Sequence, residues 1–184
     1  VTINPAIYRS LNFAPSDLVP VVALANFNQM LVCAPASGLR TLDQLDAAAR
    51  KTPGSLSYAS GGQGVPGHLA MELYLAGAGL NVLHVPYKGP SPAAQDVLAG
   101  QVPCGFLASP VVASYVTAGK LNGLAVSGST RSTVAPDIPT MSQAGVAGYD
   151  ATFREMLFAP KGTPEAIVRR MNEEVARALS LIHI

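Results

Sequence analysis

Short apolar runs alternate with amphipathic stretches along most of the chain. The runs that predict strands cover residues 21–25, 30–34, 56–60, 81–85, 102–107, 121–127 and 156–159. Between them, apolar residues recur at helical spacing, as Leu69, Leu73 and Ala76 do. Strands that alternate with helices of about three turns predict βαβ units and a parallel sheet. The fold class is therefore α/β.

Local signals predict where the helices begin. Thr41 and Gln44 have the spacing of a capping box. Pro66 suits the first position of the helix that follows the third apolar run. Ser109 comes before a proline and is expected to be an N-cap. A last amphipathic helix, over 164–179, is expected to bury its apolar face.

A glycine-rich loop joins the strand predicted at 56–60 to the helix that begins at Pro66. Glycines allow backbone angles that bring several amide hydrogens to one point. The helix start adds unpaired N–H groups and the positive end of its dipole. Such a loop favours a carboxylate or a phosphate. The candidate ligand-binding residues here are Ser60, Gly62, Gln63, Gly64 and Val65.

Two other readings of this loop stay open. It can be a tight turn with no ligand. Gly62, Gly64 and Gly67 also match G-x-G-x-x-G, so the alternative function is a nucleotide-binding or dinucleotide-binding α/β enzyme. That alternative needs an acidic residue at the end of the next strand, and the only carboxylate before it, Glu72, falls within the helix.

Other candidate side chains follow later strands. Lys88 could place a cation near the ligand, and Ser109 could add a hydroxyl, although an N-cap is its more usual role. His68, in the first turn of its helix, could touch an anion or simply pack. The histidines lack partners at metal-ligand spacing, so we expect no metal site and no cofactor. No set of residues suggests general acid or base catalysis, so we expect a binding protein and not an enzyme.

Composition narrows the possible partners. Of the 184 residues, 49% are hydrophobic and 12% charged, which excludes a disordered chain. The net charge of +1 argues against nucleic acid, and no apolar run approaches the ~20 residues that span a bilayer. Cys33 and Cys104 both lie in apolar runs. We interpret them as small buried core residues and not as a disulfide bridge.

An ordered set of short motifs resembles a known family, the Bug-type solute receptors of tripartite tricarboxylate transporters. The motifs are Tyr58-Ala-Ser-Gly-Gly-Gln-Gly-Val-Pro-Gly-His-Leu-Ala70, His84-Val-Pro-Tyr-Lys-Gly89, Gly100-Gln-Val102, Ala118-Gly-Lys-Leu121, Pro136-Asp-Ile-Pro-Thr140 and Gly162-Thr-Pro164. The chain departs from the family's usual pattern at Pro103-Cys104 and at 106–109, which leaves ligand selectivity at that corner open.

The resemblance implies a periplasmic protein with the type II periplasmic-binding-protein fold. Two Rossmann-like lobes would close on a small carboxylated metabolite, which a membrane transporter then receives. Residues 27–126 would form the second lobe, and 1–26 with 127–179 would belong to the first, most of which is missing from this chain. We therefore expect a fragment, a monomer that inserts in no membrane, with residues 180–184 as a non-native tail.

Overall fold

The computed structural model describes residues 4–7 and 9–181. The chain forms two compact units, which are described separately here. Unit 2 is the continuous segment from Phe27 to Phe153, and unit 1 contains the residues on either side of it. The candidate functional residues predicted from the sequence all lie within unit 2.

A five-stranded sheet forms the centre of unit 2, in the order β4-β3-β5-β2-β6. Its strands are β2 (Gln29–Cys33), β3 (Ser57–Ser60), β4 (Leu83–Pro86), β5 (Cys104–Ala108) and β6 (Asn122–Val126). Strand β3 pairs in parallel with β4 and β5, but β2 is antiparallel to both β5 and β6. The prediction of a parallel sheet is thus wrong for β2. This strand follows β1 after one residue, with no crossover helix to fix its direction.

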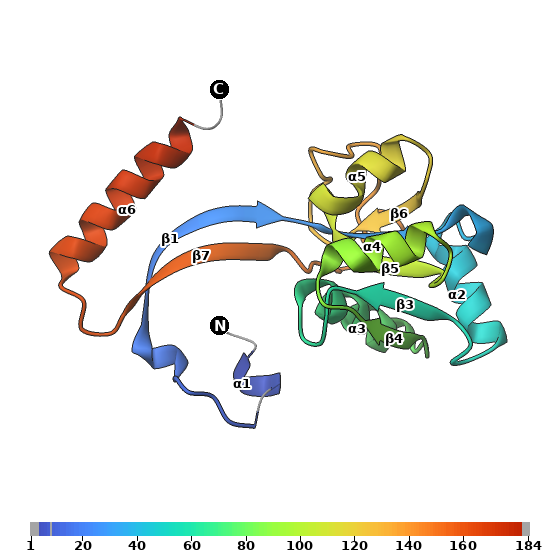
Figure 1. The fold of residues 1–184 in the computed structure, drawn as a ribbon, viewed down its shortest axis with the longest axis horizontal. Helices are drawn as coiled ribbons and strands as arrows, with labels where there is room; N and C mark the ends of the chain where they lie inside the picture. The colour runs from blue at the N-terminus through green and yellow to red at the C-terminus, as the bar shows by residue number, and fades with distance from the viewer. Residues whose placement is uncertain (1–3, 8, 182–184) are drawn as a thin grey trace. The chain divides into compact units, whose positions relative to one another are not determined.

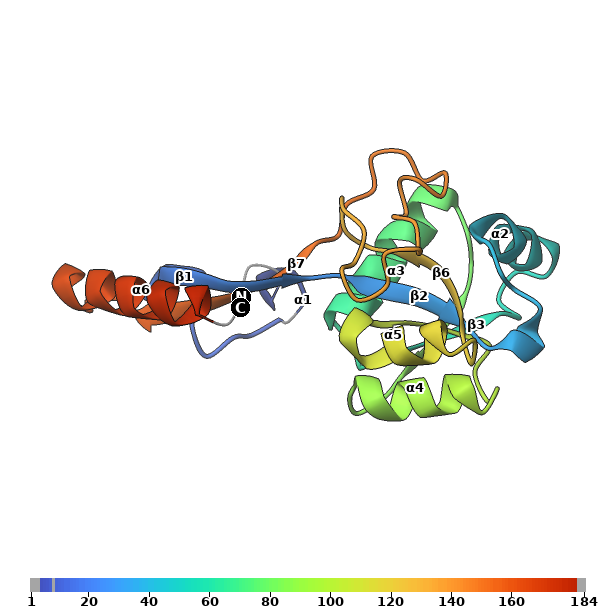
Figure 2. The same cartoon turned by 90° about the horizontal axis from the view of Figure 1, so that it is seen from above.

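Helices cover both faces of this sheet (Figures 1 and 2). They are α2 (Leu42–Lys51), α3 (Pro66–Ala78), α4 (Pro90–Leu98) and α5 (Ser109–Thr117), with a short 3-10 helix at Pro35–Ser37. The start signals at Thr41 and Pro66 are confirmed, because Thr41 Oγ1 accepts from Gln44 N–H and Pro66 begins α3. Ser109 is the first residue of α5, and Ala108 takes the N-cap position instead.

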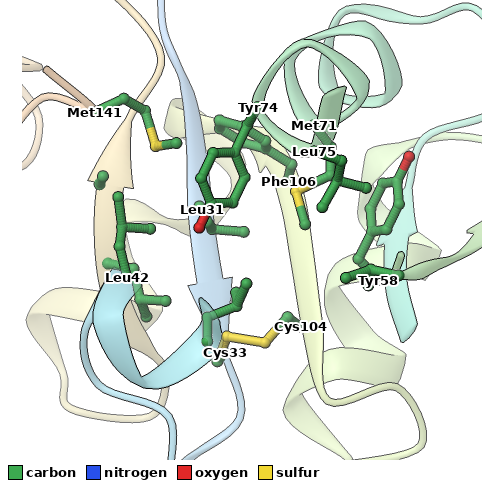
Figure 3. Packing of buried hydrophobic residues seen from close by; sticks show 14 of the residues in the cluster. Leu31, Cys33, Leu42, Tyr58, Met71, Tyr74, Leu75, Cys104, Phe106 and Met141 are labelled. Atoms are coloured by element: carbon green, nitrogen blue, oxygen red, sulfur yellow. A yellow bond between two sulfur atoms is a disulfide. The ribbon is translucent and has the colours of Figure 1, made fainter. Parts of the chain in front are cut away.

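Alternating side chains of β2 feed two hydrophobic cores, as the period of a strand requires. Leu31 and Cys33 enter the core beneath α2 and α3, together with Tyr58 and Phe106 (Figure 3). Met30 and Val32 enter the core beneath α4 and α5. Each of these β2 side chains is fully buried. A central strand buried on both faces explains the continuous apolar run in the sequence.

The two cysteines form a disulfide bridge, which corrects the prediction of two unlinked core residues (Figure 3). Cys33 and Cys104 stand opposite each other in the antiparallel pairing of β2 with β5. Both are buried, so the prediction of burial is right. Because 71 residues separate them along the chain, only the antiparallel register brings the two sulfur atoms together.

The segment 127–153 belongs to unit 2, whereas the sequence prediction assigned it to the first lobe. Thr140 forms an isolated parallel bridge with Val126, and Met141 is fully buried in the core beneath α3. The Tyr149 hydroxyl donates to the Ala70 carbonyl of α3 at 2.7 Å. The segment lacks a regular hydrophobic period because it packs as irregular backbone, so its pattern did not indicate which unit it joins.

Unit 1 contains little regular structure. Strands β1 (Leu18–Phe27) and β7 (Phe153–Pro160) form a two-stranded sheet. The other elements are α1 (Asn4–Ile7), a 3-10 helix at Pro15–Asp17 and α6 (Glu165–Ser180). The Asn172 side chain donates to the Val21 carbonyl at 2.7 Å.

The apolar face predicted for the last helix is not buried. None of the residues of α6 is buried, and Ile167 is 51% exposed. A two-stranded sheet offers too little surface to cover an amphipathic helix. Within the described part of the chain, no helix combines the length and apolarity needed to cross a membrane. Of the tail predicted at 180–184, Ser180 ends α6, and residues 182–184 lie outside the described residues.

Candidate functional site

A pocket of about 270 Å³ opens in unit 2 at one end of the inner strands of the sheet. Strand β5 ends here with Ala108, and β2 begins there because Gln29 stands opposite Ala108. The loop after β3 adds Gly61 and Val65. The full lining is Phe27, Gln29, Gly61, Val65, Pro66, Gly67, Pro90, Phe106, Leu107, Ala108 and Phe153.

Three helices begin at this pocket. Pro66 is the first residue of α3, Pro90 the first of α4, and Ala108 the N-cap of α5, and all three line the pocket. The N-terminus of a helix is the positive end of its dipole, so each of these helix starts brings partial positive charge to the pocket. No lining residue carries a carboxylate that would oppose this potential. The pocket is therefore electrostatically suited to an anion, even though its side chains are uncharged.

Gly67 lets α3 approach β5 closely. A Cβ atom added at Gly67 would lie 2.0 Å from the Phe106 carbonyl oxygen and 3.0 Å from the carbonyl carbon. Both are backbone atoms of a central strand, so they cannot move aside as a flexible side chain would. The start of α3 is thus fixed against β5 by the absence of a side chain at this position.

The glycine loop is partly closed on itself, which differs from the fan of free amides expected from the sequence. Gly62 N–H donates to Ser60 Oγ at 3.2 Å, and Gly64 N–H donates to His68 Nδ1 at 3.1 Å. Ser60 is fully buried and its hydroxyl donates to the Gly62 carbonyl at 3.0 Å. Two of the predicted anion donors therefore stabilise the loop itself. Gln63 is exposed and does not line the pocket, whereas Val65 does.

Two stacked histidines, His68 and His84, contact residues of this loop. The rings of His68 and His84 lie 4.1 Å apart between centroids, at an interplanar angle of 24°. His84 Nε2 lies 2.7 Å from Ser60 Oγ. Because His68 Nδ1 accepts the Gly64 N–H, the neutral ring carries its proton on Nε2, which lies 3.9 Å from Glu72 Oε1. The sequence showed both histidines but not that they meet.

The same group extends to a tyrosine on β3. The Tyr58 hydroxyl donates to Glu72 Oε1 at 2.8 Å, and its ring stacks on His84 with centroids 4.9 Å apart. Burial raises the pKa of Tyr58, and the bond to Glu72 raises it further. Burial lowers the pKa of His84, as does the neighbouring His68, while Glu72 acts in the opposite direction. A neutral His84 is therefore the form that suits the folded loop.

Acid is expected to destabilise the protein through His84. Since its folded pKa lies below the ordinary value of 6.5, the unfolded chain binds a proton that the folded chain does not. This contribution to stability is complete above about pH 6.5 and is lost as the pH falls below it. When the pH is lowered from 7.5 to 5.0, the midpoint temperature of thermal unfolding should fall less for His84→Gln than for the wild type. Equal losses would contradict this assignment, because His68 and Glu72 remain in both proteins.

Two further predicted residues take up positions of different kinds. Lys88 is exposed in the turn before α4 and does not line the pocket. Ser109 is 1% exposed, and its Oγ atom has no hydrogen-bond partner within the described structure. Its backbone N–H donates to the Asn28 carbonyl at 3.0 Å. The adjacent Ala108, not Ser109, lines the pocket.

Sequence reasoning missed several lining residues. Gln29 is 4% exposed, and its backbone N–H donates to Ser127 Oγ at 2.9 Å. Phe27 and Phe153, at the two ends of unit 2, have ring centroids 5.0 Å apart. A polar residue at the head of an apolar strand was the available signal for Gln29. Nothing in the sequence pairs two phenylalanines so far apart along the chain.

In the described part of the chain, no three His, Cys, Asp or Glu side chains gather so that they could hold a metal ion. The chemistry that remains at the pocket is hydrogen bonding, helix dipoles and apolar contact. This arrangement can bind and orient a small molecule.

Comparisons with known proteins agree with this description. The family described as tripartite tricarboxylate transporter family receptor matches residues 1–182. A UPF0065 protein from the tcbD-tcbE intergenic region of Pseudomonas sp. (strain P51) is 39% identical over 165 residues, which are 89% of this chain and 49% of that protein. Protein BugT of Bordetella pertussis is 35% identical over 163 residues, 89% of this chain and 50% of its own. The chain thus spans about half the length of the curated relatives it matches.

Solved structures show the same fold. The R. palustris protein Rpa4515 with adipate matches with a TM-score of 0.83 and 32% identity, over 92% of this chain and 57% of that one. MatC from Rhodopseudomonas palustris with bound malate matches with a TM-score of 0.83 and 27% identity, over 95% and 60%. The periplasmic binding protein BugD matches with a TM-score of 0.80 and 26% identity, over 95% and 57%.

Proposed function

This chain belongs to the tripartite tricarboxylate transporter receptor family, whose members bind solutes and are not enzymes, and on that premise we propose that its pocket captures a small carboxylated metabolite. The alternative of a dinucleotide-binding enzyme is set aside with this family. A dinucleotide-binding site would also need an acidic residue at the end of the strand that follows the glycine loop. Strand β4 ends at Pro86 and contains no carboxylate.

The observation that carries the proposal is the meeting of three helix starts at one pocket without acidic lining. A carboxylate placed there gains from three dipoles, each worth roughly 0.3–1 kcal/mol in exposed settings. Gly67 lets the start of α3 lie close to β5, and Gly67 itself lines the pocket. The adipate and malate in two structural neighbours support the same ligand class.

We propose further that unit 2 acts as one lobe of a two-lobed receptor. Capture would then need a second lobe, supplied by the part of the relatives' length that this chain does not match. Ligand that contacts both lobes only when they are closed shifts the population toward closure. The closed receptor would deliver its ligand to a membrane transporter in the periplasm. The Cys33–Cys104 bridge supports an oxidising compartment of this kind.

The test is a titration of the isotope-labelled chain followed by nuclear magnetic resonance. Succinate should shift the amide signals of Gly61, Val65 and Gly67, with a dissociation constant of roughly 1 mM or weaker because only part of the cleft is present. Succinamide, which is neutral and of similar size, should leave these signals in place, and sodium chloride controls for ionic strength. Equal shifts with succinate and succinamide would overturn the proposal.

A further inference from the structure

We propose that the ligand of this pocket carries an apolar body of about four to six carbons, a hydrocarbon chain or an aromatic ring, next to its carboxylate. This inference deepens the proposed function and rests on it. It distinguishes apolar carboxylates from hydroxylated or amino-substituted polyacids such as malate or citrate, which an anion-binding loop alone accepts equally well.

The lining of the pocket is apolar almost throughout. Phe27, Val65 and Phe153 contribute partly exposed apolar side chains. Phe106 and Leu107 line the pocket at the end of β5, and their side chains are buried in the two cores. No lining residue has a charged side chain. A hydroxyl or ammonium group placed against this surface would lose its bonds to water without gaining a partner. A methylene chain or a ring would instead remove apolar surface from water.

The size of the pocket suits such a body. An apolar cavity of about 150 Å³ is large enough to hold benzene. The pocket here has about 270 Å³, which leaves room for a ring or a six-carbon chain together with a carboxylate. A two-carbon body would leave much of the apolar lining in contact with water.

Phe27 and Phe153 form an apolar wall that is not fully buried. Their rings are tilted by 58° with centroids 5.0 Å apart, and both side chains remain partly exposed. A tilted pair presents ring edges and faces to a neighbour, which favours another ring or a chain beside it. The remaining exposed aromatic surface is what an apolar ligand would cover.

Gln29 provides the one polar side chain of the lining. Its backbone is satisfied within the sheet, because Gln29 N–H donates to Ser127 Oγ and the Ser127 N–H donates back to the Gln29 carbonyl. The side chain reaches the start of α3, since its Oε1 would lie 3.4 Å from a Cβ atom at Gly67. A single amide beside the helix start can orient one carboxylate, but it cannot satisfy the several polar groups of a hydroxylated polyacid.

The experiment ranks ligands on the same labelled chain. Adipate should bind roughly tenfold more tightly than succinate, because it adds two methylene groups to the same two carboxylates. Benzoate should shift the amides of Phe106 and Ala108, whereas malate should not exceed succinate. Benzamide serves as the neutral control for benzoate. If malate or citrate binds as tightly as adipate, the inference fails while the proposed function stands. If no carboxylate exceeds its neutral amide, the proposed function fails as well.

A pair of variants separates the apolar lining from general effects. Val65→Asn places a polar side chain in the lining and should weaken adipate binding roughly threefold to tenfold, and by a larger factor than it weakens succinate binding. Leu73→Asn changes a side chain on α3 that is 52% exposed and outside the pocket, and it should alter neither ligand. Well-dispersed spectra of both variants show that they are folded. Equal weakening of adipate and succinate by Val65→Asn would overturn the inference.

Discussion

Replacing Gly67 with alanine is expected to destabilise the protein by about 3 kcal/mol or more. The new methyl group would lie 2.0 Å from the Phe106 carbonyl oxygen, far inside van der Waals contact. Overpacking against rigid backbone costs about 1–3 kcal/mol and sometimes more. To relieve the clash, the start of α3 must move away from β5, which also displaces the pocket lining. Urea unfolding followed by circular dichroism measures the loss, and the succinate titration should show weaker binding.

Gly77 gives a matched control on the same helix. A Cβ atom at Gly77 meets nothing within 4 Å, so Gly77→Ala adds a methyl group without a clash. Alanine is favoured over glycine inside helices by roughly 0.5–1 kcal/mol. Gly77→Ala should therefore leave the stability unchanged or raise it. If Gly67→Ala is as stable as Gly77→Ala, the close approach of α3 to β5 is not the constraint that we describe.

Removing the disulfide bridge is expected to lower the free energy of unfolding by about 2–4 kcal/mol. The bridge joins positions 71 residues apart, so it restricts the unfolded chain strongly. In the folded state it links β2 to β5 at the centre of the sheet. The double variant Cys33→Ala and Cys104→Ala should unfold at a lower denaturant concentration than the oxidised wild type.

A reductant distinguishes the bridge from the packing of the two side chains. It should lower the unfolding midpoint of the wild type and leave that of the double alanine variant unchanged. Because both cysteines are buried, reduction of the folded protein should be slow and should accelerate as denaturant opens the sheet. If the reductant leaves the unfolding midpoint of the wild type unchanged, the disulfide bridge does not stabilise the protein.

The helices of unit 2 were predictable because their starts depend on local chemistry. The cap at Thr41 and the proline at 66 act on the backbone within one turn. The direction of β2 was not predictable, since it depends on pairing with β5 and β6 far along the chain. The disulfide bridge follows from that pairing and was missed with it. The period of α6 was read correctly as amphipathic, but burial depends on a partner surface that the described part of unit 1 does not provide.

The candidate site was predictable in place but not in detail. A glycine loop between a strand and a helix is a local signal, and the structure places Val65 at the pocket. The pairing of Gly64 N–H with His68 was hidden, because the acceptor comes from a side chain whose rotamer the sequence does not specify. Gln29 and Phe153 come from distant strands, so only the assembled sheet brings them beside the loop.

Unit 2 begins and ends at neighbouring positions. It is one uninterrupted stretch of chain, and the rings of its first and last residues, Phe27 and Phe153, are 5.0 Å apart. A segment whose two ends lie close together tolerates insertion into another protein as a domain. It also tolerates circular permutation, in which the two ends are joined and new termini are placed in another loop. Unit 2 and its pocket could therefore be inserted into another protein at a position where two strand ends lie side by side.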